Sequence, residues 1–197
     1  LKRHVMRAAA AAQRVSGARR RAGARRSVHA RADALYFAYG SNMDEKEVLT
    51  GLRGVRPLSA SPAKLEGWEL VFTVPGVPFV DPAFASVRQR EEECTHGVLY
   101  RLTASDWERV VATEPGYDVV TCSPQVYGDE APTEGALTLS WRRERERSGL
   151  LPSDAYMGFL LEGARVHGLS ADWVEALRRQ RVYTRTPRTA VAGAAAA

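Results

Sequence analysis

The sequence predicts an α+β domain built on a curved, largely antiparallel sheet. Two observations support this prediction. A strand and a helix open the ordered part, strand-like segments then dominate, and two amphipathic helical segments follow. The chain has 197 residues, which is enough for one domain with its own core. It contains no run of ~18 apolar residues, so we expect no membrane-spanning helix.

The first expected elements are a buried strand and a helix. Residues 35–39 (LYFAY) are aromatic and apolar, as in a buried strand. Ser41, Asn42 and Asp44 are suitable helix N-caps, and acidic side chains follow them in the first helical turn. Residues 51–66 are rich in turn-forming residues and predict a connecting segment.

The middle of the chain predicts further strands separated by turns. Residues 75–84 contain three prolines and a glycine, so we expect a loop there, and the acidic residues 91–93 predict a turn. The expected strands are residues 68–74, 85–90, 97–101, 117–126 and 136–141.

Three later segments have helical patterns. Ser105 and Glu108 have the spacing of a capping box, and the apolar residues that follow lie on one helical face. Ser153 is the expected cap of a second helix that ends near Gly168. Ser170 is the expected cap of a third helix over residues 171–180.

Positive charge is concentrated at the N-terminus. The chain has 28 Lys and Arg and 23 Asp and Glu, but residues 1–32 hold ten of the basic residues and no acid. Residues 33–197 therefore hold 18 basic and 23 acidic residues, a net charge of −5. This acidic balance argues against a nucleic-acid partner for the folded part.

The N-terminal segment predicts targeting rather than fold. Its Ala- and Arg-rich, acid-free composition is typical of a transit peptide, with the chloroplast favoured over the mitochondrion. The alternative is a disordered basic tail that contacts RNA or membrane, and the protein would then be cytoplasmic. We therefore divide the chain into a leader (1–32), a domain (33–181) and a disordered tail (182–197).

The cysteines predict neither a disulfide framework nor a zinc site. Cys94 and Cys122 are the only two, and no second pair of ligands stands at metal-binding spacing near Cys94 and His96. We expect no metal.

The turn at residues 39–42 (YGSN) is the first candidate site. A strand, a glycine and a helix start direct several backbone N–H groups toward one point, which suits an anion or a developing oxyanion. The alternative is a capped turn with no ligand.

Glu114 is the second candidate. It follows the end of a predicted helix, where Pro115 stops the helix and Gly116 permits a sharp turn. A carboxylate held near Tyr117 could transfer protons, although a Glu before Pro-Gly is often simply exposed.

Three motifs in order resemble the γ-glutamylcyclotransferase family over about residues 35–178. They are Tyr39-Gly40-Ser41-Asn42, then Glu114 with Gly116 and Tyr117, then Pro152-Ser153-Asp154-Ala155-Tyr156 with Gly163-Ala164 and Gly168-Leu169. The chain departs from the family pattern in its short link from glutamate to tyrosine, where Pro115 is inserted.

The resemblance implies a mixed β-barrel-like sheet with flanking helices and a cavity. It also implies attack of a γ-glutamyl substrate's own α-amine on its γ-carbonyl, which releases 5-oxoproline without metal or cofactor. Glu114 would be the catalytic acid and base. The implied substrate-binding residues are Tyr39, Gly40, Ser41, Asn42, Tyr117 and Tyr156.

Two points stay open at this level. The backbone of residues 40–42 could bind either the substrate carboxylate or the oxyanion. A non-catalytic module that binds a small metabolite on the same fold is the alternative function. The sequence indicates neither the particular γ-glutamyl substrate nor the oligomeric state.

Overall fold

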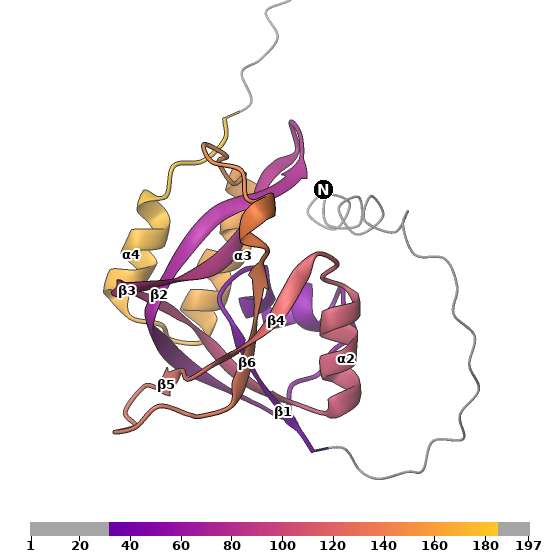
Figure 1. Cartoon of the computed structure of the whole chain (residues 1–197), viewed down its shortest axis with the longest axis vertical. Coiled ribbons are helices and arrows are strands. Elements are labelled where there is room, and N and C mark those ends of the chain that lie inside the picture. Colours follow the sequence, from indigo (N-terminus) through magenta and orange to yellow (C-terminus); the bar gives the residue numbers. More distant parts are fainter. Residues whose placement is uncertain (1–31, 185–197) are drawn as a thin grey trace, which may run out of the picture.

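The computed structural model describes residues 32–184 and contains one six-stranded sheet flanked by helices (Figure 1). The predicted leader, apart from Ala32, and residues 185–197 of the predicted tail lie outside the described residues. The strands are β1 (Ala34–Ala38), β2 (Ser59–Val77), β3 (Asp81–Leu102), β4 (Tyr117–Cys122), β5 (Gln125–Val126) and β6 (Ala136–Trp141). The helical segments are η1 (Ser41–Met43), η2 (Glu45–Thr50), α2 (Ala104–Ala112), η3 (Arg143–Arg145), α3 (Asp154–Val166) and α4 (Ala171–Arg179).

The sheet has the strand order β4-β6-β1-β3-β2-β5. Strand β1 lies inside it, antiparallel to β3 with Phe37 opposite Leu99, and parallel to β6 with Tyr36 opposite Leu137. The other pairings are antiparallel. The α+β prediction with a curved, mainly antiparallel sheet is confirmed, and the sheet is open, with β4 and β5 at its edges.

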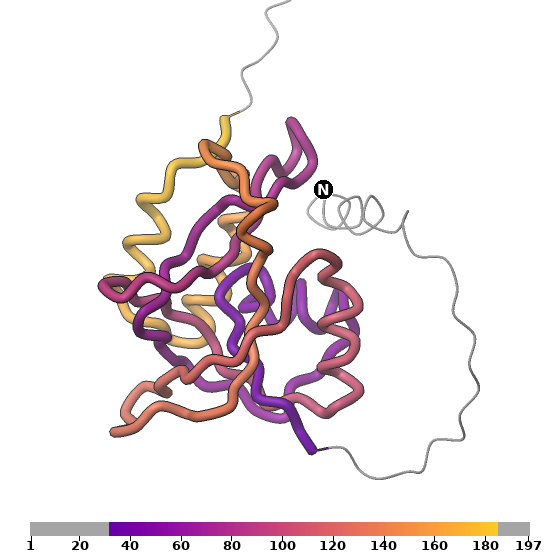
Figure 2. The backbone as a smooth tube through the Cα atoms, in the orientation of Figure 1, coloured from indigo at the N-terminus to yellow at the C-terminus, as the bar shows by residue number. Residues whose placement is uncertain are grey.

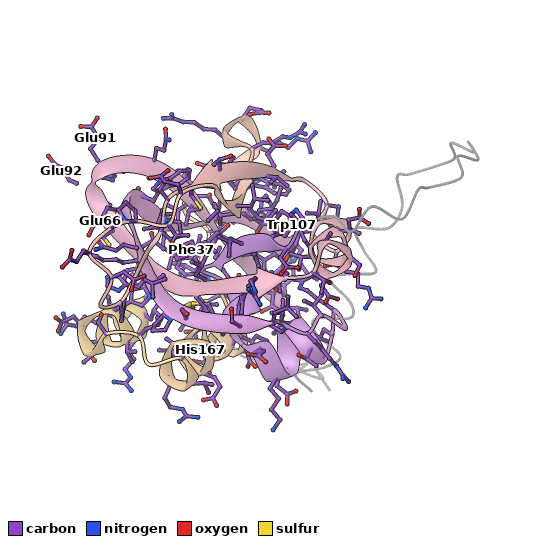
Figure 3. All side chains as sticks on the ribbon, turned by 90° about the horizontal axis from the view of Figure 1, so that it is seen from below. Phe37, Glu66, Glu91, Glu92, Trp107 and His167 are labelled. Carbon is purple, nitrogen blue, oxygen red and sulfur yellow. The ribbon has the colours of Figure 1, made fainter. Side chains whose placement is uncertain are left out.

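Strands β2 and β3 form one long hairpin, which corrects several sequence predictions. The expected loop at residues 75–84 is the end of this hairpin, and the strand β2 already begins at Ser59 within the expected connecting segment. The expected turn at residues 91–93 is instead a bulge inside β3, since the register shifts between Glu66 and Trp68. Glu91 and Glu92 project from the outside of this bulge (Figure 3). Pairing along the hairpin tolerates the prolines and the charged residues.

The predicted strand over residues 117–126 was wrong in its extent. The chain leaves β4 after Cys122 and forms β5 only at Gln125, because Pro124 between them has no N–H for a ladder. The two pieces also pair differently, β4 with β6 and β5 with β2.

The helix caps partly match the sequence. Ser153 and Ser170 cap α3 and α4 as predicted, each accepting a backbone N–H three residues later. Helix α2 begins two residues earlier than expected, because Thr103, not Ser105, accepts the N–H of Asp106.

The predicted helix after the YGSN turn is two short pieces. The first, η1, is a 3₁₀ turn, and the second, η2, is a π-helical turn capped by Asp44, which accepts the N–H of Glu47.

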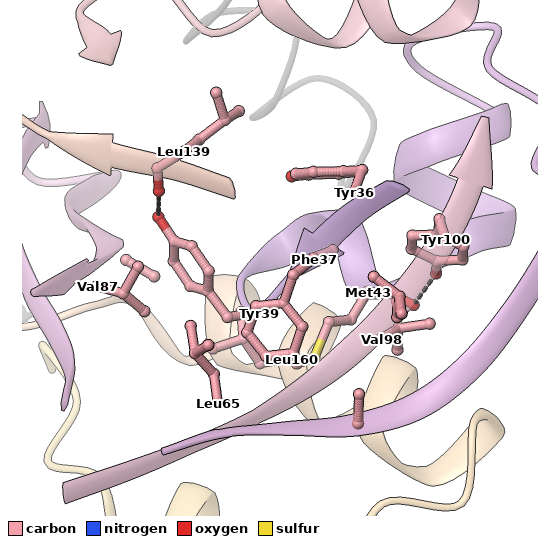
Figure 4. Close-up of a cluster of buried hydrophobic side chains, with 14 of the residues drawn as sticks. Tyr36, Phe37, Tyr39, Met43, Leu65, Val87, Val98, Tyr100, Leu139 and Leu160 are labelled. Atoms are coloured by element: carbon pink, nitrogen blue, oxygen red, sulfur yellow. Dashed lines mark hydrogen bonds between the residues drawn. The ribbon is translucent and has the colours of Figure 1, made fainter. Parts of the chain in front are cut away.

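The core fills both sides of β1 (Figure 4). Phe37, Tyr100 and Leu160 are almost completely buried there. Helix α3 comes so close to η1 that a Cβ on Gly163 would lie 2.5 Å from the carbonyl carbon of Met43. In the described part of the chain, no helix is long and apolar enough to cross a membrane.

One end of β1 lies between the helix pair α3 and α4 and the single helix α2. Helices α3 and α4 lie on one side of the view and α2 on the other (Figures 1 and 2). The chain leaves the sheet after Ala38, where η1 meets α3. This end of β1 is where the candidate site lies.

Candidate functional site

A small cavity of about 30 Å³ lies at the end of β1. It brings together the three sequence motifs, which come from the turn after β1, the turn after α2 and the start of α3. The lining residues are Tyr36, Tyr39, Gly40, Ser41, Asn42, Ala85, Glu114, Tyr117, Leu139 and Tyr156. Every predicted site residue therefore contributes to one cavity.

The turn at residues 39–42 presents its polar groups to this cavity. Ser41 and Asn42 are buried, and the 3₁₀ turn is closed by the N–H of Met43 donating to the carbonyl of Gly40 at 3.0 Å. N–H groups that precede such a turn have no partner within it. In this turn the backbone and the side chain of Ser41 hydrogen-bond the Tyr156 hydroxyl.

Gly40 lies at a crowded position, and its φ angle is an ordinary one. Its φ of −107° is accessible to other residues. A Cβ at this position would lie 3.3 Å from the hydroxyl oxygen of Tyr156 and 3.5 Å from the Cβ of Ala85. The glycine lets the Tyr156 hydroxyl lie close to the turn.

Glu114 is placed by the end of α2. The N–H of Tyr117 donates to the carbonyl of Glu114 at 3.3 Å, which closes a tight turn. Gly116 has a φ of +97°, and the Trp141 ring occupies the position that its Cβ would take. The predicted Pro-Gly turn is confirmed, and it directs the carboxylate into the cavity.

Arg53 anchors this carboxylate and was missed by the sequence analysis. Its Nη2 contacts Oε1 of Glu114, and its Nη1 donates to Oγ1 of Thr113 at 2.6 Å. Its Nε donates to Oδ1 of Asn42 at 2.6 Å. The ion pair is largely shielded, with side-chain exposures of 13% for Arg53 and 19% for Glu114. A planar guanidinium with several donors suits such a junction of three segments.

Asn42 links the turn after β1 to Glu114. Since its Oδ1 accepts from Arg53, its Nδ2 donates to Oε1 of Glu114 at 3.2 Å and to the Tyr36 hydroxyl at 2.9 Å. Among the described residues, both hydrogen bonds to Glu114's carboxylate therefore reach Oε1. The second oxygen, Oε2, is left for a ligand.

The tyrosine hydroxyls in the cavity are neutral at physiological pH. Burial raises the pKa of Tyr36, Tyr39 and Tyr117 well above the ordinary tyrosine value, and raises that of Tyr156 to about 12. The Tyr39 hydroxyl contacts the carbonyl of Leu139, as Figure 4 shows, and that of Tyr117 donates to the carbonyl of Ala85 at 2.8 Å. These phenols are hydrogen-bonding groups rather than bases.

The cavity combines a carboxylate that has one free oxygen with several neutral phenols. This set can exchange a proton with an amine and stabilise an oxygen that gains negative charge. Within residues 32–184, no group of three or more His, Cys, Asp or Glu side chains is placed to hold a metal ion.

Comparison with protein families decides the family of this chain. Residues 36–158 match the family described as "Gamma-glutamyl cyclotransferase, AIG2-like". The chain belongs to this family. The matched span contains every residue that lines the cavity, and Arg53 as well.

Curated members of the gamma-glutamyl cyclotransferase family include two fungal relatives of this chain. The chain is 29% identical over 175 residues to gamma-glutamyl cyclotransferase aclK of Aspergillus oryzae, which covers 78% of this chain. It is 29% identical over 140 residues to gamma-glutamyl cyclotransferase gliK of Claviceps purpurea, which covers 66% of this chain. In each case the chain spans 63% of the length of the relative.

A solved gamma-glutamyl cyclotransferase has the same fold. It superposes with a TM-score of 0.66 and covers 79% of this chain, while this chain covers 92% of that one. The sequence identity is 22%, so this likeness concerns the fold.

The sequence missed Arg53 and Tyr36 as site residues. Arg53 follows η2 in a turn-rich stretch and is 61 residues from Glu114, so no local pattern indicates its role. Tyr36 lies in an apolar strand and looks like a core residue. Its position three residues before the YGSN turn was the one available signal.

Proposed function

We propose that this protein cleaves a γ-glutamyl amide by attack of the substrate's α-amine on its own γ-carbonyl. The products are 5-oxoproline and a free amine. The arrangement of Glu114 supports this proposal most directly, because one carboxylate oxygen is held by Arg53 and Asn42 while the other is left for substrate. Family membership supports a cyclotransferase-type activity.

The reaction requires one proton carrier. Oε2 of Glu114 takes a proton from the α-ammonium, and the freed amine forms a bond to the γ-carbonyl carbon. The oxyanion that results collapses and breaks the bond to the leaving nitrogen, which receives this first proton from Glu114. Glu114 then moves the second proton of the attacking nitrogen to the released amine, which leaves neutral 5-oxoproline and an ammonium product. The nucleophile belongs to the substrate, so rate enhancement comes mainly from holding the substrate folded and from stabilising the oxyanion.

The proposed substrates share the γ-glutamyl group and differ in the amine that is joined to its γ-carbonyl. We propose γ-glutamyl-amino acids first, with γ-glutamyl-amines and glutathione as close variants. The fold is shared with a yeast protein described as specific to glutathione, with a TM-score of 0.54 and 11% identity. The targeting leader and organelle location remain predictions.

The test is product formation by the full chain. We would incubate it with γ-glutamyl dipeptides, γ-glutamyl-lysine and glutathione, and measure 5-oxoproline by mass spectrometry. Release of 5-oxoproline from at least one substrate is expected. Thermal stabilisation by these compounds without product would favour the metabolite-binding module instead. If the chain gave neither product nor thermal stabilisation with any of these compounds, the γ-glutamyl proposal would have no support.

A further inference from the structure

The four tyrosine hydroxyls that line the cavity differ in what their protons can do. Tyr36 and Tyr39 come from β1 and its turn, Tyr117 from β4, and Tyr156 from α3. A neutral phenol has one proton to donate and an oxygen that accepts. Where its neighbour can only donate or only accept, the direction of the hydrogen bond is fixed.

Two of these protons are committed to the protein. The Tyr39 hydroxyl contacts the backbone carbonyl of Leu139, and the Tyr117 hydroxyl lies 2.8 Å from the carbonyl of Ala85. A carbonyl oxygen only accepts, so both hydroxyls donate to backbone. These two side chains line the wall with their protons already in use.

The Tyr36 hydroxyl accepts a hydrogen bond from the protein instead of donating one. Arg53 is always a donor, so Oδ1 of Asn42 must face it, and Nδ2 of Asn42 must face Tyr36. The hydroxyl oxygen of Tyr36 is then an acceptor at 2.9 Å, and its proton is available in the cavity. Among the described residues, no hydrogen bond uses that proton.

Tyr156 also accepts, but at another part of the cavity. The N–H of Ala85 donates to its oxygen at 3.1 Å, and its hydroxyl lies beside Gly40 and Ser41. Tyr36 instead shares the amide of Asn42 with Oε1 of Glu114. Of the four hydroxyls, that of Tyr36 therefore both has an available proton and adjoins the carboxylate.

We propose that Tyr36 is a catalytic residue that donates a hydrogen bond to the γ-carbonyl oxygen as it becomes an oxyanion. This inference rests on the proposed γ-glutamyl cyclisation. The carbonyl under attack must lie near the amine that Glu114 deprotonates, and the Tyr36 hydroxyl is one amide group away from that carboxylate.

The experiment compares Tyr36→Phe with a control outside the cavity, Tyr127→Phe, whose hydroxyl contacts His96 and accepts the N–H of Ser170. Both substitutions remove one tyrosine hydroxyl that takes part in hydrogen bonds within the protein. For Tyr36→Phe we expect kcat for 5-oxoproline release to fall by about 100-fold or more, with KM changed less than about threefold, as for loss of one oxyanion donor. For Tyr127→Phe we expect a lower unfolding temperature and a kcat within about threefold of wild type, because its hydroxyl bonds residues that do not line the cavity.

A second variant separates donation from positioning. Replacing Tyr36 by fluorinated tyrosines keeps the hydroxyl that accepts from Asn42 while making it a stronger donor. If Tyr36 donates to the oxyanion, kcat changes progressively with the acidity of the phenol. A kcat that is independent of phenol acidity, or a Tyr36→Phe variant with the kcat of Tyr127→Phe, would overturn the inference while the cyclisation stands. A wild-type protein without product would overturn both.

Discussion

The guanidinium of Arg53 holds Oε1 of Glu114, and its other nitrogens bind the residues on either side of that contact, Asn42 and Thr113. One side chain thereby joins the turn after β1 to the end of α2. Because Asn42 also donates to Oε1 of Glu114, this junction fixes the orientation of the Glu114 carboxylate.

Replacing Arg53 tests this junction. In Arg53→Met, Glu114 loses its charged partner in a shielded position, so we expect the free energy of unfolding to fall by roughly 3 kcal/mol. We also expect kcat to fall, because the carboxylate is no longer oriented. Arg53→Lys should recover only part of either property, since an ammonium cannot reach all three partners. Urea unfolding and 5-oxoproline release measure the two effects.

Arg56→Met is the matched control for this prediction. Arg56 is an exposed arginine three residues along the chain. Its removal should change stability by less than about 0.5 kcal/mol and leave kcat unaltered. Equal effects of the two substitutions would contradict the role assigned to Arg53.

Gly163 on α3 allows η1, which carries Asn42, to pack closely against this helix. Its backbone lies against Met43, next to Asn42, so the methyl group in Gly163→Ala would overlap atoms of the η1 backbone. We expect a loss of about 1–3 kcal/mol of stability together with lower activity, because η1 must move away from α3. Val166→Ala, at an exposed position of the same helix, should change neither. An active Gly163→Ala variant of wild-type stability would show that the close approach is not required.

Two partly buried histidines predict a dependence of stability on pH. Burial lowers the pKa of His96 and of His167 below the ordinary histidine value. The unfolded chain then binds more protons than the folded one below about pH 6.5. The contribution of the neutral histidines to the free energy of unfolding is complete above that pH. It is lost as the pH falls through the lower pKa values that the histidines have in the folded chain.

Urea unfolding at several pH values between 7.5 and 5 measures this effect. The wild-type free energy of unfolding should decrease toward acid pH, and the double variant His96→Gln/His167→Gln should show a shallower decrease. The same slope in both proteins would mean that other groups, such as carboxylates, determine the acid sensitivity.

The sequence predicts the parts of this molecule that depend on local chemistry. The caps Ser153 and Ser170, the turn at Pro115-Gly116 and the apolar strand before Tyr39 all follow from residue types and spacing. The three motifs also predict residues that share one cavity.

Other features depend on tertiary pairing that no local pattern shows. The β2–β3 hairpin runs through proline-rich and acidic segments because two long strands support each other across their irregularities. Arg53 joins the site because the turn after η2 folds onto the end of α2, far away in sequence. The crowding at Gly40 likewise comes from Tyr156, which lies on α3.

The most direct test of the account is release of 5-oxoproline by the wild-type chain and by Glu114→Gln. The glutamine keeps the shape and an oxygen for Arg53 and Asn42 but cannot carry the proton. We predict that the substitution lowers kcat by about 10²–10⁴-fold while the substrate still raises the unfolding temperature. A Glu114→Gln protein that forms product at the wild-type rate would contradict the central claim, since the proton carrier would then be another group.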